Sequence, residues 1–269
     1  MNKISIINGL RKYIKNYISV AFNIYKHREK IKVVFKDGHK EILDRNLIIV
    51  SLIEQLYGIK LVGTKDNGEL GPVFLNEDYK FLKPINGNIV IDIGANIGDS
   101  TVWFGIMGAS KIIALEPYQH SFKTAVQNIE LNHLGNKVVI LKAGYGKDAF
   151  IEIENKISNI GTVLEEHIGG DKTPIFSLKT ILDKYVPKDV KGLLLKMDCE
   201  GCEYNILTES DQTLKKFSKI IIEYHNGYEK LKNKLKDCGF SVKYTDPVYS
   251  YNPDANRSLI QGYIFAYNP

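Results

Sequence analysis

A strand–turn–helix–strand pattern near residue 90 constrains the fold of this 269-residue chain more than any other feature. An unbroken apolar run at 89–93 predicts a parallel strand buried on both faces. Glycines at 94 and 98 follow it, and residues without bulk let the backbone approach a ligand. A second apolar run, 111–115, ends at Glu116, whose carboxylate suits the two hydroxyls of a ribose. The pattern predicts an α/β fold with a nucleoside-type cofactor site.

The glycine spacing discriminates between nucleotide cofactors. A dinucleotide fingerprint reads G-x-G-x-x-G, and its middle glycine lets the backbone reach a pyrophosphate. This chain has Asn96 at that place, and Asp92 adds a negative charge near the expected phosphates. The same charge suits S-adenosylmethionine, which carries an ammonium and a sulfonium. A nicotinamide-dependent oxidoreductase is therefore the weaker alternative, and a purely structural glycine turn is another.

Five sequence blocks together are specific enough to indicate a family. They are V-I-D-I-G-A-N-I-G at 90–98, A-L-E-P at 114–117, N-I-E-L-N at 128–132, L-K-M-D-C-E-G-C-E-Y at 195–204 and I-I-E-Y-H at 221–225. Over roughly residues 75–225 they resemble the FkbM family of S-adenosylmethionine-dependent methyltransferases. The resemblance implies a Rossmann-like class I methyltransferase sheet, mostly parallel with antiparallel C-terminal strands, and a small N-terminal α/β extension before it. It also implies methylation of oxygen, often on sugars or natural products.

The chain divides by pattern and charge into three parts. Residues 1–30 carry seven basic residues and one acid, which is a net charge of +6. The whole chain has a net charge of +5, so the other residues sum to −1. A body without excess positive charge gives no reason to expect nucleic-acid binding. Residues 31–85 predict a small α/β lead-in, with a hairpin over 32–43, a helix at 47–56 ended by Gly58, and loops at 66–68 and 71–72. Residues 86–269 form the expected methyltransferase domain.

The first part reads as one basic amphipathic helix over 4–25. Its apolar stripe is Ile7, Leu10, Ile14, Tyr17, Ala21 and Tyr25. Two interpretations stay open: a helix packed on the domain with a solvated basic face, or a surface helix on an anionic membrane or an acidic partner. The chain has no uninterrupted apolar run of about 18 residues, so the sequence predicts no membrane span.

Alternating strands and helices in the third part predict a parallel sheet. A short strand at 149–153 precedes an expected loop to 175, and a further loop is expected at 246–257 between two terminal strands. The expected strands are 89–93, 111–115, 137–142, 192–197, 218–224, 240–245 and 258–267, and the expected helices are 99–107, 118–132, 178–185 and 227–237.

The expected cofactor residues follow the first three strands, because ligands of open α/β sheets bind beyond the carboxyl ends of the strands. Backbone N–H groups of the glycine turn face the cofactor. Asp99 and Ser100 either contact it or cap the next helix, and Tyr118 either stacks beside the adenine or packs inside. The segment 142–146 lacks an acid that could hold the adenine amino group. The full set is Asp92, Gly94, Asn96, Gly98, Asp99, Ser100, Glu116, Pro117, Tyr118 and Gly144.

The expected acceptor residues follow two later strands. Asp198 and Glu200 stand where they can orient or deprotonate a hydroxyl, and Glu223 and His225 end the next strand. Glu203 is interpreted as complementing a helix dipole. We expect no metal, although clustered carboxylates can hold Mg²⁺ or Ca²⁺.

The three cysteines suggest a reducing compartment and no disulfide scaffold. Cys199 and Cys202 have no second pair for zinc and are expected to fill small apolar sites.

The sequence thus predicts an S-adenosylmethionine-dependent methyltransferase that methylates a hydroxyl on a sugar, glycolipid or related metabolite. A non-catalytic methyltransferase-like binding module is the alternative from outside the enzymes. The expected partner is a small-molecule or glycan acceptor, without nucleic acid, and the sequence sets no oligomeric state. The expected location is cytoplasmic, with peripheral membrane contact through residues 1–30 as the second possibility.

Overall fold

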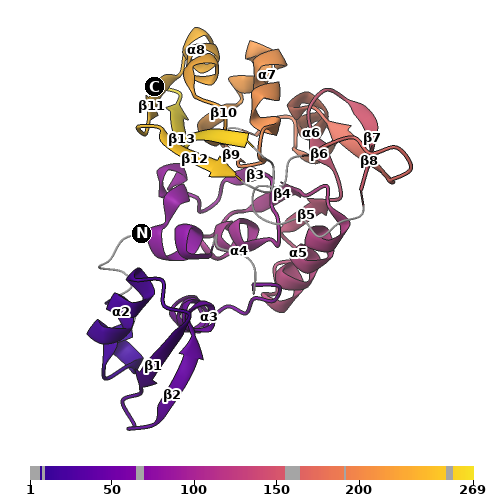
Figure 1. Cartoon of the computed structure of the whole chain (residues 1–269). Coiled ribbons are helices and arrows are strands. Elements are labelled where there is room, and N and C mark those ends of the chain that lie inside the picture. The colour runs from indigo at the N-terminus through magenta and orange to yellow at the C-terminus, as the bar shows by residue number, and fades with distance from the viewer. Residues whose placement is uncertain (1–6, 8–9, 65–69, 155–163, 191, 253–256) are drawn as a thin grey trace. The chain divides into compact units, whose positions relative to one another are not determined.

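A computed structural model describes residues 7, 10–64, 70–154, 164–190, 192–252 and 257–269 (Figure 1). The chain forms two compact units, Met1–Asp78 and Tyr79–Pro269. The boundary lies a few residues before the expected one at 85, because Tyr79 packs on Trp103 and Phe104 of the second unit.

The first unit contains the predicted hairpin and helix. Strands β1 (Lys30–Val34) and β2 (Lys40–Asp44) pair antiparallel. Helix α3 (Arg45–Tyr57) ends at Gly58, which adopts the left-handed conformation. The loop expected at 71–72 is instead the start of a helical turn, η1 (Gly71–Asn76), with proline in its first turn, where no backbone donor is needed. The loop expected at 66–68 lies outside the described residues.

The single helix expected over 4–25 is wrong. The backbone leaves the helix at Ile14, which bridges to Phe35 of the hairpin. The Asn16 side chain accepts from the backbone of Val34 and donates to the carbonyl of Lys32, so it satisfies hydrogen bonds that a continuous helix would not offer. Helix α2 then runs over Tyr17–Tyr25.

The interruption divides the expected apolar stripe. Leu10 and Ile14 are buried, as the packed interpretation expects, whereas Tyr25 is exposed. Helix α2 buries Val20 and Ile24 instead and exposes Ile18 and Phe22. No helix in the described part of the chain has the length and apolarity to cross a bilayer.

The second unit is built on the predicted sheet, and the fold class is confirmed. The strand order is β11-β13-β10-β9-β3-β4-β5, in which β13 runs antiparallel to both neighbours and the pairs from β10 to β5 are parallel. The strands are β3 (Ile89–Ile93), β4 (Lys111–Leu115), β5 (Val138–Leu141), β9 (Leu193–Met197), β10 (Phe217–Tyr224), β11 (Ser241–Tyr244) and β13 (Arg257–Tyr267).

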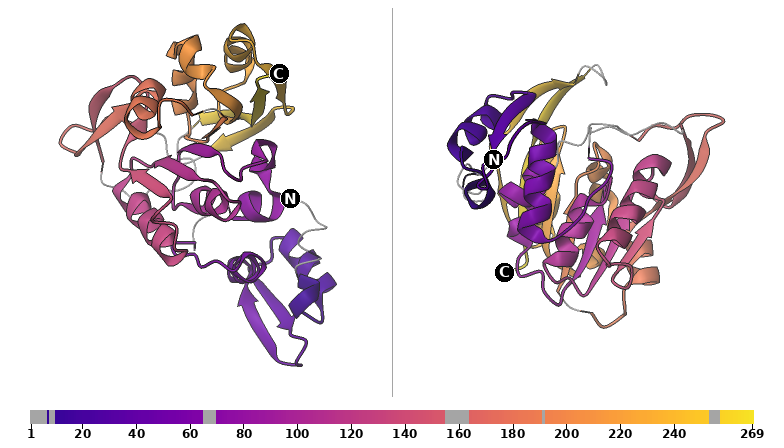
Figure 2. Two further views of the ribbon diagram at one scale, coloured as in Figure 1. Left: turned by 180° about the vertical axis from the view of Figure 1, so that it is seen from behind. Right: turned by 90° about the horizontal axis from the view of Figure 1, so that it is seen from below.

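Helices cover both faces of this sheet (Figures 1 and 2). On one face, Ile91 of β3 shares an apolar cluster with Leu182 and Leu231 of the covering helices. On the other face lie α4, which buries Trp103 and Phe104, and α5. Burial on both faces explains the continuous apolar strands. The helices are α4 (Asp99–Ile106), α5 (Gln119–Leu131), α6 (Leu178–Tyr185), α7 (Asp211–Leu214) and α8 (Glu229–Asp237), with shorter turns η2 (Asp78–Leu82) and η3 (Cys202–Thr208).

Two segments expected as loops contain strands. Strand β8 (Asp171–Phe176) lies between β6 (Gly144–Tyr145) and the predicted β7 (Ala149–Ile153) in a separate three-stranded sheet. Strand β12 (Val248–Asn252) pairs with β13. Both strands are fixed by pairing partners elsewhere in the chain, and a local pattern does not reveal such partners.

Candidate active site

The glycine turn after β3 lies against the end of β9. Gly94 has a φ of +79°, and a Cβ there would lie 1.8 Å from the carbonyl oxygen of Asp198. Gly98 also has positive φ, and its Cβ would approach Ala125 of α5 at 3.1 Å. Asn96 adopts positive φ as well. Glycine at 94 is therefore required both for conformation and for space. Gly94 and Asn96 are partly exposed and mark the open side of the turn.

Asp92 lies beneath this turn and not on its open side. Its carboxylate is fully buried, and the hydroxyls of Ser100 and Thr101 donate to one oxygen at 2.8 and 2.7 Å. The Lys196 ammonium is 3.1 Å from the other oxygen and donates to the carbonyl of Gly94 at 2.7 Å. Asp92 and Ser100 thus hold the turn in place, whereas the sequence placed the Asp92 charge beside the ligand.

Asp99 begins α4 and is also buried. Its carboxylate accepts from the backbone N–H of Ser100 at 2.9 Å, as a residue in the first turn of a helix does. Burial raises the pKa of Asp99 to about 6, against the opposing effect of Lys196. This bond reaches only the next residue, and no side chain caps α4 at Gly98, so neither capping nor cofactor contact is assigned to Asp99.

Glu116 follows β4 and faces the glycine turn. One carboxylate oxygen accepts from the backbone N–H of Asn96 and the other from that of Tyr118, each at 3.0 Å. A carboxylate oxygen has two lone pairs, so each keeps one for a ligand hydroxyl. Burial raises the pKa of Glu116 to about 7, although both backbone bonds lower it. The placement suits the predicted ribose contact.

The remaining predicted cofactor residues follow β4 and β5 along the chain. Pro117 is half-buried, and Tyr118 is mostly buried just before α5. Burial raises the pKa of Tyr118 to about 12, with Glu116 adding to the effect. Gly144 is buried in β6, where a Cβ would lie 2.6 Å from a methyl group of Ile175. Asn128 donates to the carbonyl of Ile97 and so supports the glycine turn.

These residues fit an adenosyl cofactor by two observations. Gly94 has no side chain and is partly exposed, so a ligand can reach its backbone on the side that does not pack against Asp198. Glu116 follows β4, one strand away from the point where the strand order reverses between β3 and β9, and each of its carboxylate oxygens keeps a lone pair for a ligand.

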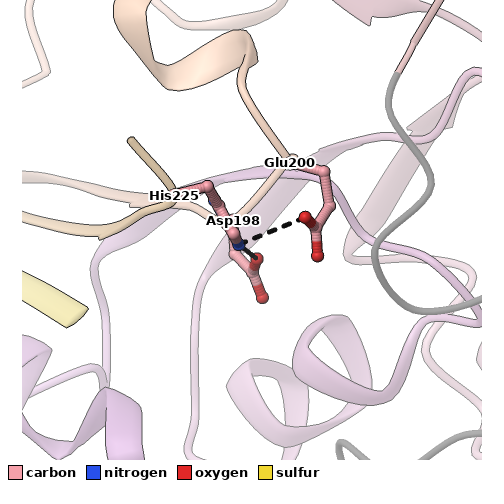
Figure 3. A group of neighbouring side chains, drawn as sticks. All are labelled: Asp198, Glu200 and His225. Carbon is pink, nitrogen blue, oxygen red and sulfur yellow. Dashed lines mark ion pairs between the residues drawn. The ribbon is translucent and has the colours of Figure 1, made fainter. Parts of the chain in front are cut away.

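A second group lies at the neighbouring strand ends (Figure 3). Asp198 follows β9 and His225 follows β10. Nε2 of His225 is 3.9 Å from Oδ1 of Asp198 and 3.4 Å from Oε2 of Glu200. The Tyr79 hydroxyl donates to the other oxygen of Asp198 at 3.3 Å. The structure thus brings together three of the four predicted acceptor residues. Glu223 is half-buried on β10 and is not among the three.

Glu203 supports His225, and its interpretation as a helix-dipole residue is incomplete. It is fully buried, and one oxygen accepts from both the backbone N–H and Nδ1 of His225, at 3.0 and 3.1 Å. Its other oxygen accepts from the backbone of Gly201 at 2.7 Å. Burial alone would lower the pKa of His225, but the bond to Glu203 and the nearby acids raise it to about 9. The surrounding acids therefore favour a cation at Nε2 of His225, and a proton takes that place at neutral pH when no other cation does. Asp198 and Glu200 are the groups left to accept a proton from an acceptor.

Cys199 and Cys202 form a disulfide, which corrects the expectation that they fill separate apolar sites. Positive φ at Glu200 and Gly201 turns the chain between them and brings their Cα atoms to 5.4 Å. Sequence reasoning also missed Tyr79, because 119 residues separate it from Asp198 and no local motif joins them.

Comparisons with known proteins agree with this geometry. A family model described as the methyltransferase FkbM domain matches residues 92–242. No curated protein matches the chain. A METTL16 methyltransferase domain is 14% identical with a TM-score of 0.54, covering 98% of this chain and 92% of its own. The N-terminal domain of human METTL16 in complex with SAH is also 14% identical with a TM-score of 0.54, covering 93% and 94%. These two likenesses concern the fold. The chain belongs to the FkbM methyltransferase family, and its cofactor is S-adenosylmethionine.

Proposed function

We propose that the protein methylates a hydroxyl of a small polar acceptor, such as a sugar, a glycolipid or a related metabolite. The observation that supports this most is the contact between the glycine turn and Asp198, where a Cβ on Gly94 would meet the Asp198 carbonyl. The glycine turn that holds the cofactor and the acids Asp198 and Glu200 are therefore neighbours. Methyl transfer requires this, because the cofactor sulfur, the methyl carbon and the acceptor oxygen must lie in line.

One set of residues binds the cofactor and another binds the acceptor. Glu116 and the backbone around Gly94 hold the cofactor, which supplies an electrophilic methyl group when bound. Asp198 and Glu200 orient the acceptor hydroxyl and take its proton, so each transfer releases one proton. Tyr79 anchors Asp198 from one side, and Glu203 holds His225 from the other.

Product formation tests the proposal. Release of S-adenosylhomocysteine should be measured over a panel of sugars, glycolipids and hydroxylated metabolites. Asp198→Asn should lower turnover by more than about tenfold while cofactor affinity changes little. Glu116→Ala should weaken cofactor binding about tenfold or more, because bonds to a charged group contribute roughly 1.5–3 kcal/mol each.

Asp183→Asn, an exposed acid on α6 that pairs with Lys179, provides the matched control and should match the wild type in both assays. If Asp198→Asn keeps the full rate of methyl transfer, Asp198 does not act in catalysis. Cofactor binding without turnover on any hydroxyl acceptor would favour the non-catalytic module.

The charge and exposed face of the first unit support contact with an anionic membrane. Ile18, Phe22 and Tyr25 lie on one side of α2 at helical spacing and are exposed. They accompany the strongly basic segment 1–30. An apolar stripe flanked by lysines suits a lipid surface with negative headgroups. Such contact would place the enzyme near a lipid-linked acceptor.

A further inference from the structure

Three side chains converge at the carboxyl ends of β9 and β10 (Figure 3). One oxygen each from Asp198 and Glu200 and one nitrogen of His225 all lie within 4.8 Å of one another. We propose that these residues, named here the carboxylate–histidine site, bind a divalent transition-metal ion. The sequence alone favoured no metal, because nothing local shows that His225 faces the two acids.

The spacing of the ligand atoms suits a single ion. Ligands about 2.1 Å from a common ion lie about 3.0 Å apart at right angles and about 3.4 Å apart in a tetrahedron. Nε2 of His225 is 3.4 Å from the Glu200 oxygen and 3.9 Å from the Asp198 oxygen. Small side-chain rotations of the two acids would bring all three atoms to one ion, and neither strand would have to move.

The orientation of His225 is an independent observation that points to a ligand. Its side chain is only 1% exposed, and Nδ1 is bonded to the buried Glu203 at 3.1 Å. A histidine that binds a metal through one nitrogen commonly donates its other N–H to a carboxylate. Glu203 is itself held by the backbone of Gly201, so Nε2 is directed rigidly toward Asp198 and Glu200.

The charge and the donor types favour a metal ion as occupant. Three carboxylates, Asp198, Glu200 and Glu203, surround a single imidazole, so negative charge is in excess among these four side chains. Two oxygens and one nitrogen form a mixed donor set that suits divalent transition metals better than Mg²⁺ or Ca²⁺, which prefer oxygen alone. Three protein ligands also leave coordination positions open.

The role of the ion rests on the proposed function. An acceptor hydroxyl that binds an open position becomes more acidic. Its proton then passes to the second oxygen of Glu200, and the acceptor oxygen is held beside the glycine turn. The ion therefore does part of the work that the carboxylates would otherwise do alone.

Direct binding of Mn²⁺ to the full chain tests the site without cofactor or acceptor. Titration calorimetry should show one Mn²⁺ per chain, and pulsed electron paramagnetic resonance should show coupling to one imidazole nitrogen. Glu200→Gln should weaken Mn²⁺ binding by at least about tenfold, because even loss of a supporting residue around a metal site costs that much. Glu130→Gln, the same change at an exposed acid of α5, should leave the affinity at the wild-type value.

The proposal fails if Mn²⁺ shows no nitrogen coupling, or if Glu200→Gln and Glu130→Gln bind it equally. The stoichiometry and the nitrogen coupling are both measured on the wild-type protein, so they do not depend on whether a variant folds. Failure of this test leaves the proposed methyl transfer intact, because S-adenosylhomocysteine release is measured separately. Conversely, absence of turnover on every acceptor leaves the Mn²⁺ result unaffected.

Discussion

Replacing Lys196 should destabilise the second unit strongly, because this lysine is a buried cation beneath the cofactor turn. It is 1% exposed, lies 3.1 Å from the fully buried Asp92, and donates to the Gly94 carbonyl. Burial alone would lower the pKa of Lys196, but Asp92 and the neighbouring acids raise it, so the ammonium keeps its charge. Lys196→Met would leave the Asp92 carboxylate buried without its counter-ion.

The expected cost can be worked from this geometry. Removing one partner of a buried ion pair costs about 3–5 kcal/mol. Asp92 keeps the hydroxyls of Ser100 and Thr101, which favours the lower end. About 3 kcal/mol corresponds to a fall in melting temperature of about 6–12 °C for a unit of this size. Asp92→Asn added to Lys196→Met should recover part of the loss, because no unpaired charge remains buried.

Thermal and denaturant unfolding of both variants measure this effect. Lys243→Met, at an exposed lysine of β11, is the matched control and should change the free energy of unfolding by less than about 0.5 kcal/mol. The reasoning is refuted if Lys196→Met is as stable as the control, or if the double variant is no more stable than Lys196→Met.

Three further predictions concern the turn, the cofactor and the membrane. Gly94→Ala should reduce cofactor affinity and stability, since its Cβ would overlap the Asp198 carbonyl. Gly38→Ala, at φ +92° in open space, is the control, and thermal unfolding should show that it costs only about 1–2 kcal/mol. Because burial raises the pKa of Glu116 to about 7 and ribose hydroxyls donate best to the ionised form, cofactor affinity should level off above that pH and fall below it, about tenfold per unit. In calorimetry, Glu116→Gln should lose this slope, and a slope that survives would contradict the assignment. Phe22→Ser should reduce co-sedimentation with anionic vesicles at low salt, and a wild-type protein that ignores such vesicles would end the membrane proposal.

Local pattern was sufficient for the strands of the parallel sheet and for the cofactor turn, but not for β8 and β12. The apolar run at 89–93 became β3 with the same bounds, because a strand buried on both faces needs such a run. Gly94 could be recognised because the close approach it permits restricts the residue type at that position. Glu116 was predictable for a similar reason, since its place at a strand end follows from the length of β4.

Only the tertiary structure decided which side chains meet. Asp92 was expected beside the ligand, but Lys196 of a neighbouring strand covers it, and that contact depends on the register between β3 and β9. The helix expected over 4–25 was interrupted by a hairpin that offers Asn16 better hydrogen bonds. The bond between Glu203 and His225 joins elements 22 residues apart. Local periodicity reports which face of an element is buried, whereas such contacts depend on how strands pair across the whole sheet.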